Sequence, residues 1–328
     1  MTFSRISLAA ALAACSFGGT ATAATFKWAS ASDIPTWDVH SQNNALGNGV
    51  HAAVYESLFY YNSKTFALEP LLATGSRQVS PTQVRITLRP NVKFHDGAAF
   101  DADDVVFSLN RAMAKTSNYG VYTQGIDKVV KVDALTVDIF TKAPNPVLLR
   151  QLTELRMMDK DWSEKNKSVE PKDNKTKDEN FAHRNANGTG PFVLKSWEQD
   201  VKLVLAKNPN WWGKMEGNVT EIVYTPIKAE ATRVAALLSG EVDMILDPSP
   251  ADLPRLRGAS NLKVLDGAEN RTIFFGMDQF RDELPGSNVK GKNPLKDIKV
   301  RKALYQAIDI QAIAKTTMRG LAQPTGTL

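Results

Sequence analysis

The sequence has a single cysteine, Cys15, among its 328 residues. This scarcity excludes a disulfide framework and a zinc site built from thiolates. The chain also lacks the H-E-x-x-H, G-x-S-x-G, P-loop and G-x-G-x-x-G patterns of metalloprotease, serine-nucleophile, nucleotide and dinucleotide sites. The formal net charge is only +5, and no basic stripe with interleaved aromatic residues is present. We therefore expect no metal, no cofactor, no nucleic-acid partner and no catalytic apparatus.

A long apolar run is missing as well, because the first apolar stretch, 6–14, is too short to span a bilayer. Following Arg5, it is typical of an export signal. Ala21-Thr22-Ala23 is a cleavage site of the A-x-A type, which predicts a signal peptide over 1–23. Alternatively, Leu12-Ala13-Ala14-Cys15 is similar to the lipobox of bacterial lipoproteins. Simple cleavage predicts a periplasmic protein, whereas acylation of Cys15 predicts a lipid-anchored one.

The composition is that of an ordinary globular protein, with 43% hydrophobic and 23% charged residues. One core seldom grows past about 250–300 residues, so two lobes are expected. Periodicity and turn residues predict a mixed α/β protein. The expected elements of the first half are a helix through Val50, Val54 and Leu58, a strand 84–88, a helix capped by Asp101 and a hairpin 129–140 that turns at Asp133-Ala134. Those that follow are a hairpin 192–207, a strand–helix–strand run 221–246 with Gly240 as the left-handed helix cap, a strand 273–275 and a helix 297–309 capped by Asp297. The charged segment 159–187 is predicted to be a solvated surface excursion.

The histidines do not form a site in the sequence. His40, His51, His95 and His183 lack the i, i+3 or i+4 spacing of metal ligands on a helix. His95-Asp96 has the composition of a catalytic dyad, but Phe94-His95-Asp96-Gly97 is better explained as the end of a hairpin.

Aromatic residues in loops are the remaining candidates. Trp37 lies among Asp33, Asp38 and Asn43 in the loop that leaves the first strand. Open α/β sheets place ligands in such loops, at the carboxyl ends of strands. A tryptophan there is equally well explained as a plug under a surface loop. Trp211-Trp212 follows a hairpin and is predicted to pack against the sheet edge.

Several motifs together resemble one family. The stretches are Leu88-Arg89-Pro90-Asn91-Val92-Lys93-Phe94-His95-Asp96-Gly97, Ala102-Asp103-Asp104-Val105-Val106-Phe107-Ser108-Leu109, Gly188-Thr189-Gly190-Pro191-Phe192, Asn208-Pro209 with Trp211-Trp212, and Gly240-Glu241-Val242-Asp243. In this order they are similar to the family 5 extracellular solute-binding proteins, the receptors of ABC importers for peptides, nickel and opines. The resemblance runs over essentially all of the chain after residue 23.

The resemblance implies a periplasmic binding protein-like, two-lobed α/β clamp of type II. Lobe one is expected to use 24–47 and 183–268 for its main sheet, with 48–182 as an inserted subdomain. Lobe two would start over 269–328. Because the sequence stops at Leu328, the second lobe is expected to be incomplete. The ligand's charges would then be paired by residues beyond this sequence.

The function that follows from the resemblance is that of an extracytoplasmic receptor, not an enzyme. It would capture di- or oligopeptides between its lobes and deliver them to permease subunits at the inner membrane, as a monomer. A nickel chelate, haem, an opine or another small solute is the alternative ligand, and an exported hydrolase is the more distant alternative. The best candidates for ligand contact are Asp33, Trp37, Asn43 and Phe275, placed at strand ends facing the expected cleft.

Overall fold

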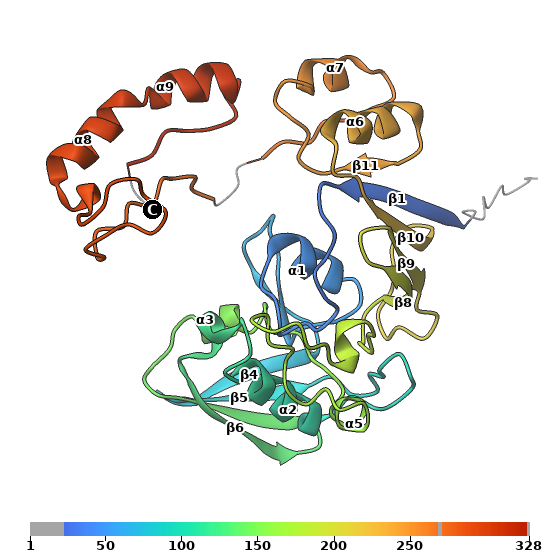
Figure 1. The fold of residues 1–328 in the computed structure, drawn as a ribbon. Coiled ribbons are helices and arrows are strands. Elements are labelled where there is room, and N and C mark those ends of the chain that lie inside the picture. The colour runs from blue at the N-terminus through green and yellow to red at the C-terminus, as the bar shows by residue number, and fades with distance from the viewer. Residues whose placement is uncertain (1–22, 268–270, 327–328) are drawn as a thin grey trace, which may run out of the picture. The chain divides into compact units, whose positions relative to one another are not determined.

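The computed structural model describes residues 23–267 and 271–326 of the chain. It divides into two compact units. The first unit comprises the residues up to Lys228 together with Val242–Met244, and the second comprises 229–241 and the residues from Ile245 onward (Figure 1). The fold is mixed α/β, as the sequence predicts.

A five-stranded sheet forms one part of the first unit, in the order β11-β1-β10-β9-β8. β1 runs parallel to β10, whereas β9 is antiparallel to both of its neighbours. The predicted hairpin 192–207 is confirmed, and Asp200 in its turn has a φ of 61°. The strands are β1 (Ala24–Ser30), β8 (Phe192–Glu198), β9 (Lys202–Lys207), β10 (Val219–Pro226) and β11 (Met244–Ile245).

A four-stranded antiparallel sheet forms the other part of the first unit, in the order β4-β5-β7-β6. It contains the predicted strand 84–88 and the predicted hairpin 129–140, whose turn lies at Ala134-Leu135, one residue later than predicted. A separate two-stranded ribbon, β2–β3, precedes it. The strands are β2 (Phe59–Tyr61), β3 (Leu68–Pro70), β4 (Ala73–Ser80), β5 (Gln83–Leu88), β6 (Ile126–Asp133) and β7 (Thr136–Thr141).

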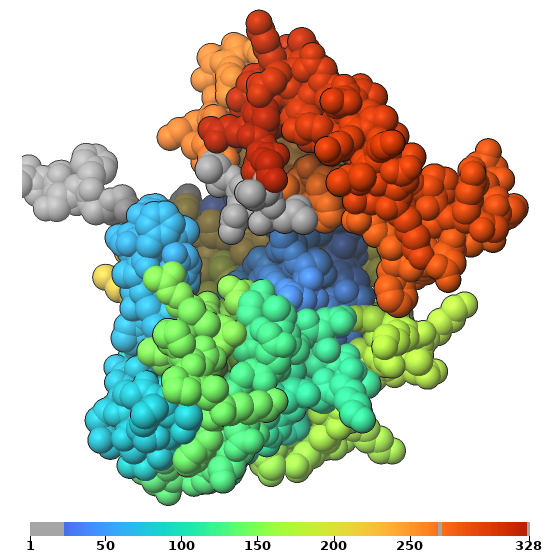
Figure 2. All heavy atoms as spheres, turned by 90° about the vertical axis from the view of Figure 1, so that its left-hand side faces the viewer, coloured from blue at the N-terminus to red at the C-terminus, as the bar shows by residue number. Residues whose placement is uncertain are grey.

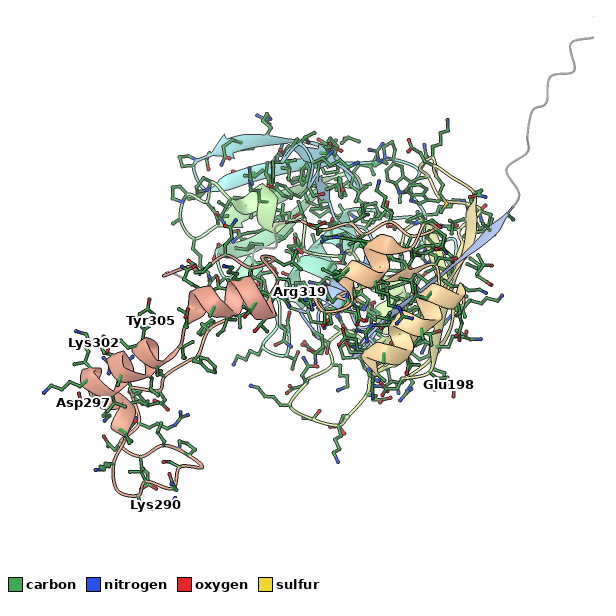
Figure 3. All side chains as sticks on the ribbon, turned by 90° about the horizontal axis from the view of Figure 1, so that it is seen from above. Glu198, Lys290, Asp297, Lys302, Tyr305 and Arg319 are labelled. Carbon is green, nitrogen blue, oxygen red and sulfur yellow. The ribbon has the colours of Figure 1, made fainter. Side chains whose placement is uncertain are left out.

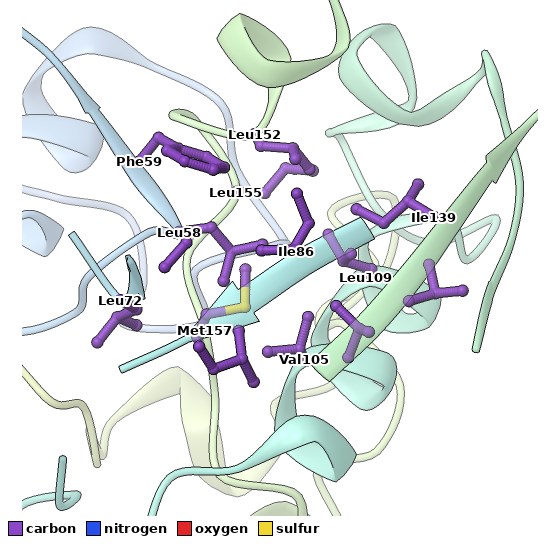
Figure 4. Packing of buried hydrophobic residues seen from close by; sticks show 14 of the residues in the cluster. Leu58, Phe59, Leu72, Ile86, Val105, Leu109, Ile139, Leu152, Leu155 and Met157 are labelled. Atoms are coloured by element: carbon purple, nitrogen blue, oxygen red, sulfur yellow. The ribbon is translucent and has the colours of Figure 1, made fainter. Parts of the chain in front are cut away.

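Helix α2 (Ala102–Ala112) covers the four-stranded sheet because its apolar side chains recur at helical spacing. Val105 and Leu109 are fully buried against Ile86 and Ile139 in the larger hydrophobic core (Figure 4). Asp101 caps the helix, as predicted, by accepting the Asp103 N–H at 2.7 Å.

Helix α1 (Ala45–His51) is shorter than the sequence predicts. Val50, Val54 and Leu58 have helical spacing, but the helix ends at His51. The spacing has another cause, because Val50 and Val54 belong to the core beneath the five-stranded sheet and Leu58 belongs to the core of the four-stranded sheet. The chain leaves the helix so that the Val54 carbonyl can accept the Gly190 N–H at 2.9 Å.

The charged segment 159–187 only partly fits the predicted solvated excursion. Its atoms reach the surface (Figure 2), but Ser163, Ser168, Ala182 and His183 are buried. His183 is buried against Thr36 of the loop after β1, and Ser168 is buried where its carbonyl accepts from Arg111. A hydrophobicity pattern cannot show such polar contacts. The short helices of the first unit are α3 (Gly120–Thr123), α4 (Leu148–Gln151), α5 (Lys160–Lys165) and a 3-10 turn (Phe181–His183).

The second unit is helical. Gly240 ends α6 (Glu230–Ser239) with a φ of 77°, the left-handed cap that the sequence predicts. Asp297 caps α8 (Ile298–Ala307), also as predicted, and Tyr305 points outward from it (Figure 3). The predicted strand 273–275 is wrong, because no described residue pairs with this run as a strand. The other elements are α7 (Leu253–Gly258), a 3-10 turn (Pro294–Lys296), α9 (Ile310–Ala312) and a π-helical turn (Ile313–Thr317).

Candidate functional site

A buried ion pair fixes the loop between β1 and α1, which carries three of the four predicted ligand residues. Arg111 on α2 donates from Nη1 to Asp38 Oδ1 at 2.6 Å and from Nη2 to Oδ2 at 2.7 Å. Both side chains have no exposed area. Two parallel hydrogen bonds between a guanidinium and a carboxylate give the geometry that best compensates the cost of removing both charges from water. The loop is therefore bound to the helix of the neighbouring sheet.

The same ion pair holds the charged segment 159–187. Asp38 also accepts the Lys172 N–H and the Asn180 side-chain amide, at 2.9 and 2.8 Å. Arg111 also donates from Nε to the Ser168 carbonyl and from Nη2 to the Glu170 carbonyl, both at 3.1 Å. Burial alone would raise the pKa of Asp38, but the Arg111 charge and these hydrogen bonds lower it to about 2. Asp38 is therefore ionised at every ordinary pH.

Three histidines hold the backbone and side chains of this loop. His51 Nε2 donates to the Thr36 carbonyl at 2.8 Å, and His40 Nε2 donates to the Arg156 carbonyl at 3.0 Å. His183 Nδ1 lies 2.9 Å from Thr36 Oγ1, and its carbonyl accepts the Trp37 N–H. The sequence predicts that these histidines do not bind a metal. It does not reveal that they form hydrogen bonds that hold the loop. The only sequence signal is polar residues alternating with Trp37 and Val39 along the loop.

Trp37 is fully buried in the core beneath the five-stranded sheet. Its ring lies 5.5 Å from that of His51, and no described residue accepts its indole N–H. This is the position of a plug under the loop, one of the two interpretations that the sequence allows. Contact with a solute stays a prediction for Trp37.

Asp33 is committed to protein donors. Its Oδ2 accepts the Trp197 indole N–H at 2.9 Å and the Asp200 N–H at 2.8 Å. It therefore ties the loop to the β8–β9 turn. Asn43 is exposed and accepts from Asn48 at 2.9 Å. Phe275 lies in the second unit, where 79% of its area is exposed. The structure thus brings Asp33, Trp37 and Asn43 onto one loop, and their roles in binding stay predictions.

A small apolar cavity of about 140 Å³ opens beside α1. No polar side chain among the described residues lines it, and none of Asp33, Trp37, Asn43 and Phe275 belongs to its lining. The lining consists of Phe26, Trp28, Gly49, Val50, Ala53, Leu203, Leu205 and Ile222.

Three of the sequence motifs meet at one buried carboxylate, Glu56. Thr189 and Trp212 donate to its Oε2 at 2.8 and 2.9 Å, and Trp211 donates to Oε1 at 3.2 Å. Arg89 lies over the Trp212 ring, 4.2 Å from its centre. Burial raises the pKa of Glu56, although these hydrogen bonds oppose the rise. Trp211 and Trp212 are thus structural, as the sequence predicts, but their partner is Glu56 instead of a sheet edge.

His95 belongs to the same junction. Its backbone N–H donates to the Gly188 carbonyl at 2.9 Å. In its ring, Nε2 donates to the Gly190 carbonyl at 3.0 Å and Nδ1 accepts the Gly188 N–H at 3.3 Å. Gly97 turns the chain with a φ of 96°. The ring bonds to backbone, so the hairpin-end interpretation of this motif holds and the dyad does not.

Two further findings concern the described residues alone. No group of three histidine, cysteine, aspartate or glutamate side chains among them is arranged to hold a metal ion. Within residues 23–267 and 271–326, no helix has the length and apolar character needed to cross a bilayer.

Comparison with known proteins defines the class. The profile of the bacterial extracellular solute-binding proteins, family 5 (middle region), matches residues 67–328. The chain therefore belongs to this family, as its motifs indicate. It is a family of solute-binding proteins, which agrees with the prediction that the chain is not an enzyme.

Individual relatives agree with this assignment. The chain is 29% identical over 300 residues to the glutathione-binding protein GsiB of Salmonella paratyphi A, covering 89% of this chain and 54% of the relative. It is 27% identical over 263 residues to the dipeptide-binding protein of Escherichia coli, covering 71% and 44%. The chain thus spans about half the length of these relatives.

A solved structure supports the fold class. NikZ from Campylobacter jejuni, in complex with Ni(L-His), has a TM-score of 0.75 and 23% identity, covering 90% of this chain and 55% of that one. The predicted periplasmic binding protein fold is therefore confirmed.

Proposed function

We propose that this chain belongs to an exported receptor that captures small peptides for an ABC importer. Family membership over residues 67–328 carries the proposal. The names of two relatives favour peptides as the ligand class, because glutathione is a modified tripeptide and the other relative binds dipeptides. An extended peptide offers backbone groups that pair as an added strand does, so side chains of many kinds can be accepted.

The organisation of the protein follows from the same proposal. Residues 1–23 serve as the signal peptide, with acylation at Cys15 as the alternative. The main sheet of lobe one uses 24–47 and 183–268, 48–182 is its insertion, and lobe two starts at 269. The receptor acts in the periplasm as a monomer, and its partner is the permease. Closure of two lobes around the solute removes water, which strengthens each polar contact.

Calorimetry with the full-length receptor, including the whole of lobe two, tests the ligand class. Glutathione, dipeptides, longer peptides, an opine and a nickel–histidine chelate are titrated in turn at pH 7. We expect heat of binding with peptides alone. Binding of the nickel chelate or the opine without peptide binding would replace peptides by that solute. Hydrolysis of the peptides during the titration would contradict the receptor function.

The loop residues are tested in the same assay. Asn43→Ala removes an exposed side chain whose amide oxygen accepts from Asn48 on α1. If Asn43 contacts the solute, the loss of one hydrogen bond weakens binding by about 0.5–1.5 kcal/mol. Asn110→Ala, at an exposed position on α2, is the matched control and leaves affinity unchanged. Equal affinities for both variants would remove Asn43 from the site.

A further inference from the structure

The loop Ile34–Ser41 is held by histidines that each use one particular protonation state. His51 and His40 donate from Nε2 to carbonyl groups, so their Nδ1 atoms carry no proton at neutral pH. His183 donates from Nε2 to Glu179 at 3.0 Å, and its Nδ1 accepts the Thr36 hydroxyl. Thr36 Oγ1 in turn accepts the Asp38 N–H at 3.0 Å. Neutral imidazole fits all three positions.

A second proton has no place at two of these rings. His40 Nδ1 faces the Arg111 guanidinium at 3.3 Å, so a proton there would put two donors and two positive charges together. His51 Nδ1 is buried and meets no acceptor among the described residues. His183 is better suited to protonation, because Glu179 is at its Nε2. An imidazolium at His40 or His51 is therefore compatible only with an opened loop.

The charges around the rings do not remove this conflict. Asp38 favours protonation of all three histidines, but its carboxylate is already saturated by Arg111, Lys172 and Asn180. The other charged groups that face the rings are Arg111 and Arg156, from α2 and the chain after α4, and Glu179, Arg184 and Lys172, from the charged segment. Most of these are cations, which oppose a further positive charge.

We propose that His40 and His51 form an acid-sensitive latch that opens the loop Ile34–Ser41 while both sheets of the first unit stay folded. Trp37 lies in this loop, so opening would also lower affinity for a solute. That consequence rests on the proposed function, whereas opening of the loop does not.

The size of the effect follows from proton linkage. Burial lowers the pKa of His40 to about 3 and that of His51 to about 4, from the ordinary value of 6.5. The opened loop binds more protons than the closed loop, so the opening constant rises as the pH falls below 6.5. Between pH 7 and pH 4.5 it rises by on the order of 50-fold for each histidine.

Hydrogen exchange of the full chain, read by mass spectrometry at pH 7 and pH 4.5 and corrected for intrinsic rates, tests the latch. We expect protection of 34–41 to fall at least tenfold while β5 stays protected. His51→Gln keeps an N–H for the Thr36 carbonyl but cannot be protonated, so its loop loses less protection. His95→Gln is the control, because His95 is partly buried but bonds to Gly188 and Gly190 instead of the loop.

Unchanged loop protection across this pH range would overturn the proposal. So would equal loss in the loop and in β5, or an equal effect of the two substitutions. Should His51→Gln fail to fold, imidazole titration of the wild-type protein by nuclear magnetic resonance decides, since a pKa near 6.5 for His40 and His51 is incompatible with the latch. Calorimetry at pH 7 separates the two ideas: no solute binding there contradicts the proposed function and leaves the exchange result standing.

Discussion

At the scale of single residues, the side chains that organise the first unit are polar and buried. Glu56 accepts from Thr189 and from the adjacent Trp211 and Trp212, which all lie far along the chain from it. Hydrophobic periodicity in a sequence does not reveal polar contacts between distant residues. The sequence therefore shows that Trp211 and Trp212 are present, but not which group they bond to. Their partner becomes visible once the chain has folded. The Asp38–Arg111 pair has the same character.

Glu56→Gln tests this junction. The amide keeps one acceptor oxygen and turns a donor toward an indole N–H, so at least one buried hydrogen bond to a charged group is lost. We expect a loss of about 1.5–3 kcal/mol in the free energy of unfolding. Urea unfolding followed by tryptophan fluorescence measures it. Glu198→Gln, at an exposed position (Figure 3), should stay within about 0.5 kcal/mol of wild type. Equal free energies of unfolding for the two variants would show that the hydrogen bonds of Glu56 do not stabilise the fold.

Glycines give a second residue-scale prediction. A Cβ on Gly188 would lie 2.0 Å from the Val54 carbonyl oxygen, which is backbone and cannot move aside. Gly188→Ala should therefore cost about 1–3 kcal/mol of stability or more. Gly49 lies in α1 with open space around it, so Gly49→Ala should instead stabilise by about 0.5–1 kcal/mol. Thermal unfolding of both variants measures the difference in sign. A stable Gly188→Ala protein would mean that this close approach is absent.

At the scale of elements, local signals succeeded where the cause of structure is local. The Asp101 cap, the hairpin turn between β6 and β7, to within one residue, and the Gly240 C-cap were all predictable, because each depends on a few consecutive residues. The helix through Val54 and the strand at 273–275 were not predicted correctly. Val54 and Leu58 are apolar, but they pack into two different cores formed with distant parts of the chain. Residues 273–275 are apolar as well, but no strand among the described residues pairs with them.

The candidate site divides in the same way. The sequence could point to the loop after the first strand, because loops at strand ends hold ligands in open α/β sheets. It could not show that Asp33 accepts a hydrogen bond from Trp197 or that Trp37 is buried. Such contacts join residues more than a hundred positions apart in the chain, or depend on which side of the loop faces the core.

The cap of α2 gives the prediction at this scale. Asp101 accepts the Asp103 N–H, and Asp104 accepts the Asp101 N–H at 2.9 Å, which completes a capping box. Asp101→Ala should lower the free energy of unfolding by about 0.5–2 kcal/mol without changing solute affinity. Asp101→Asn keeps the acceptor oxygen and should stay close to wild type. Denaturant titration and calorimetry on both variants check this, and a tenfold loss of affinity in a stable Asp101→Ala protein would contradict the capping role.

At the scale of the whole molecule, the described residues are unequally packed. Both hydrophobic cores consist entirely of residues of the first unit. In the second unit, α8 has no buried residue among its ten, and Leu304 and Tyr305 are 43% and 65% exposed. Helices of this length gain most of their stability from packing. The two units should therefore differ strongly in local stability.

Limited proteolysis with chymotrypsin tests this difference. Phe274, Phe275 and Phe280 are 61%, 79% and 93% exposed in a stretch without strand or helix, whereas Phe94 and Phe100 are each 3% exposed in the core of the four-stranded sheet. A protease needs several residues of extended backbone, which the first segment offers without unfolding and the second offers only after the sheet opens. We expect the first cuts between 274 and 280, with the fragment that precedes them accumulating, as read by mass spectrometry. Trypsin is the matched probe, since Arg271 and Arg281 flank the same stretch. Early cuts near residues 94–100 at a similar rate would show that the first unit does not have the greater stability its cores imply.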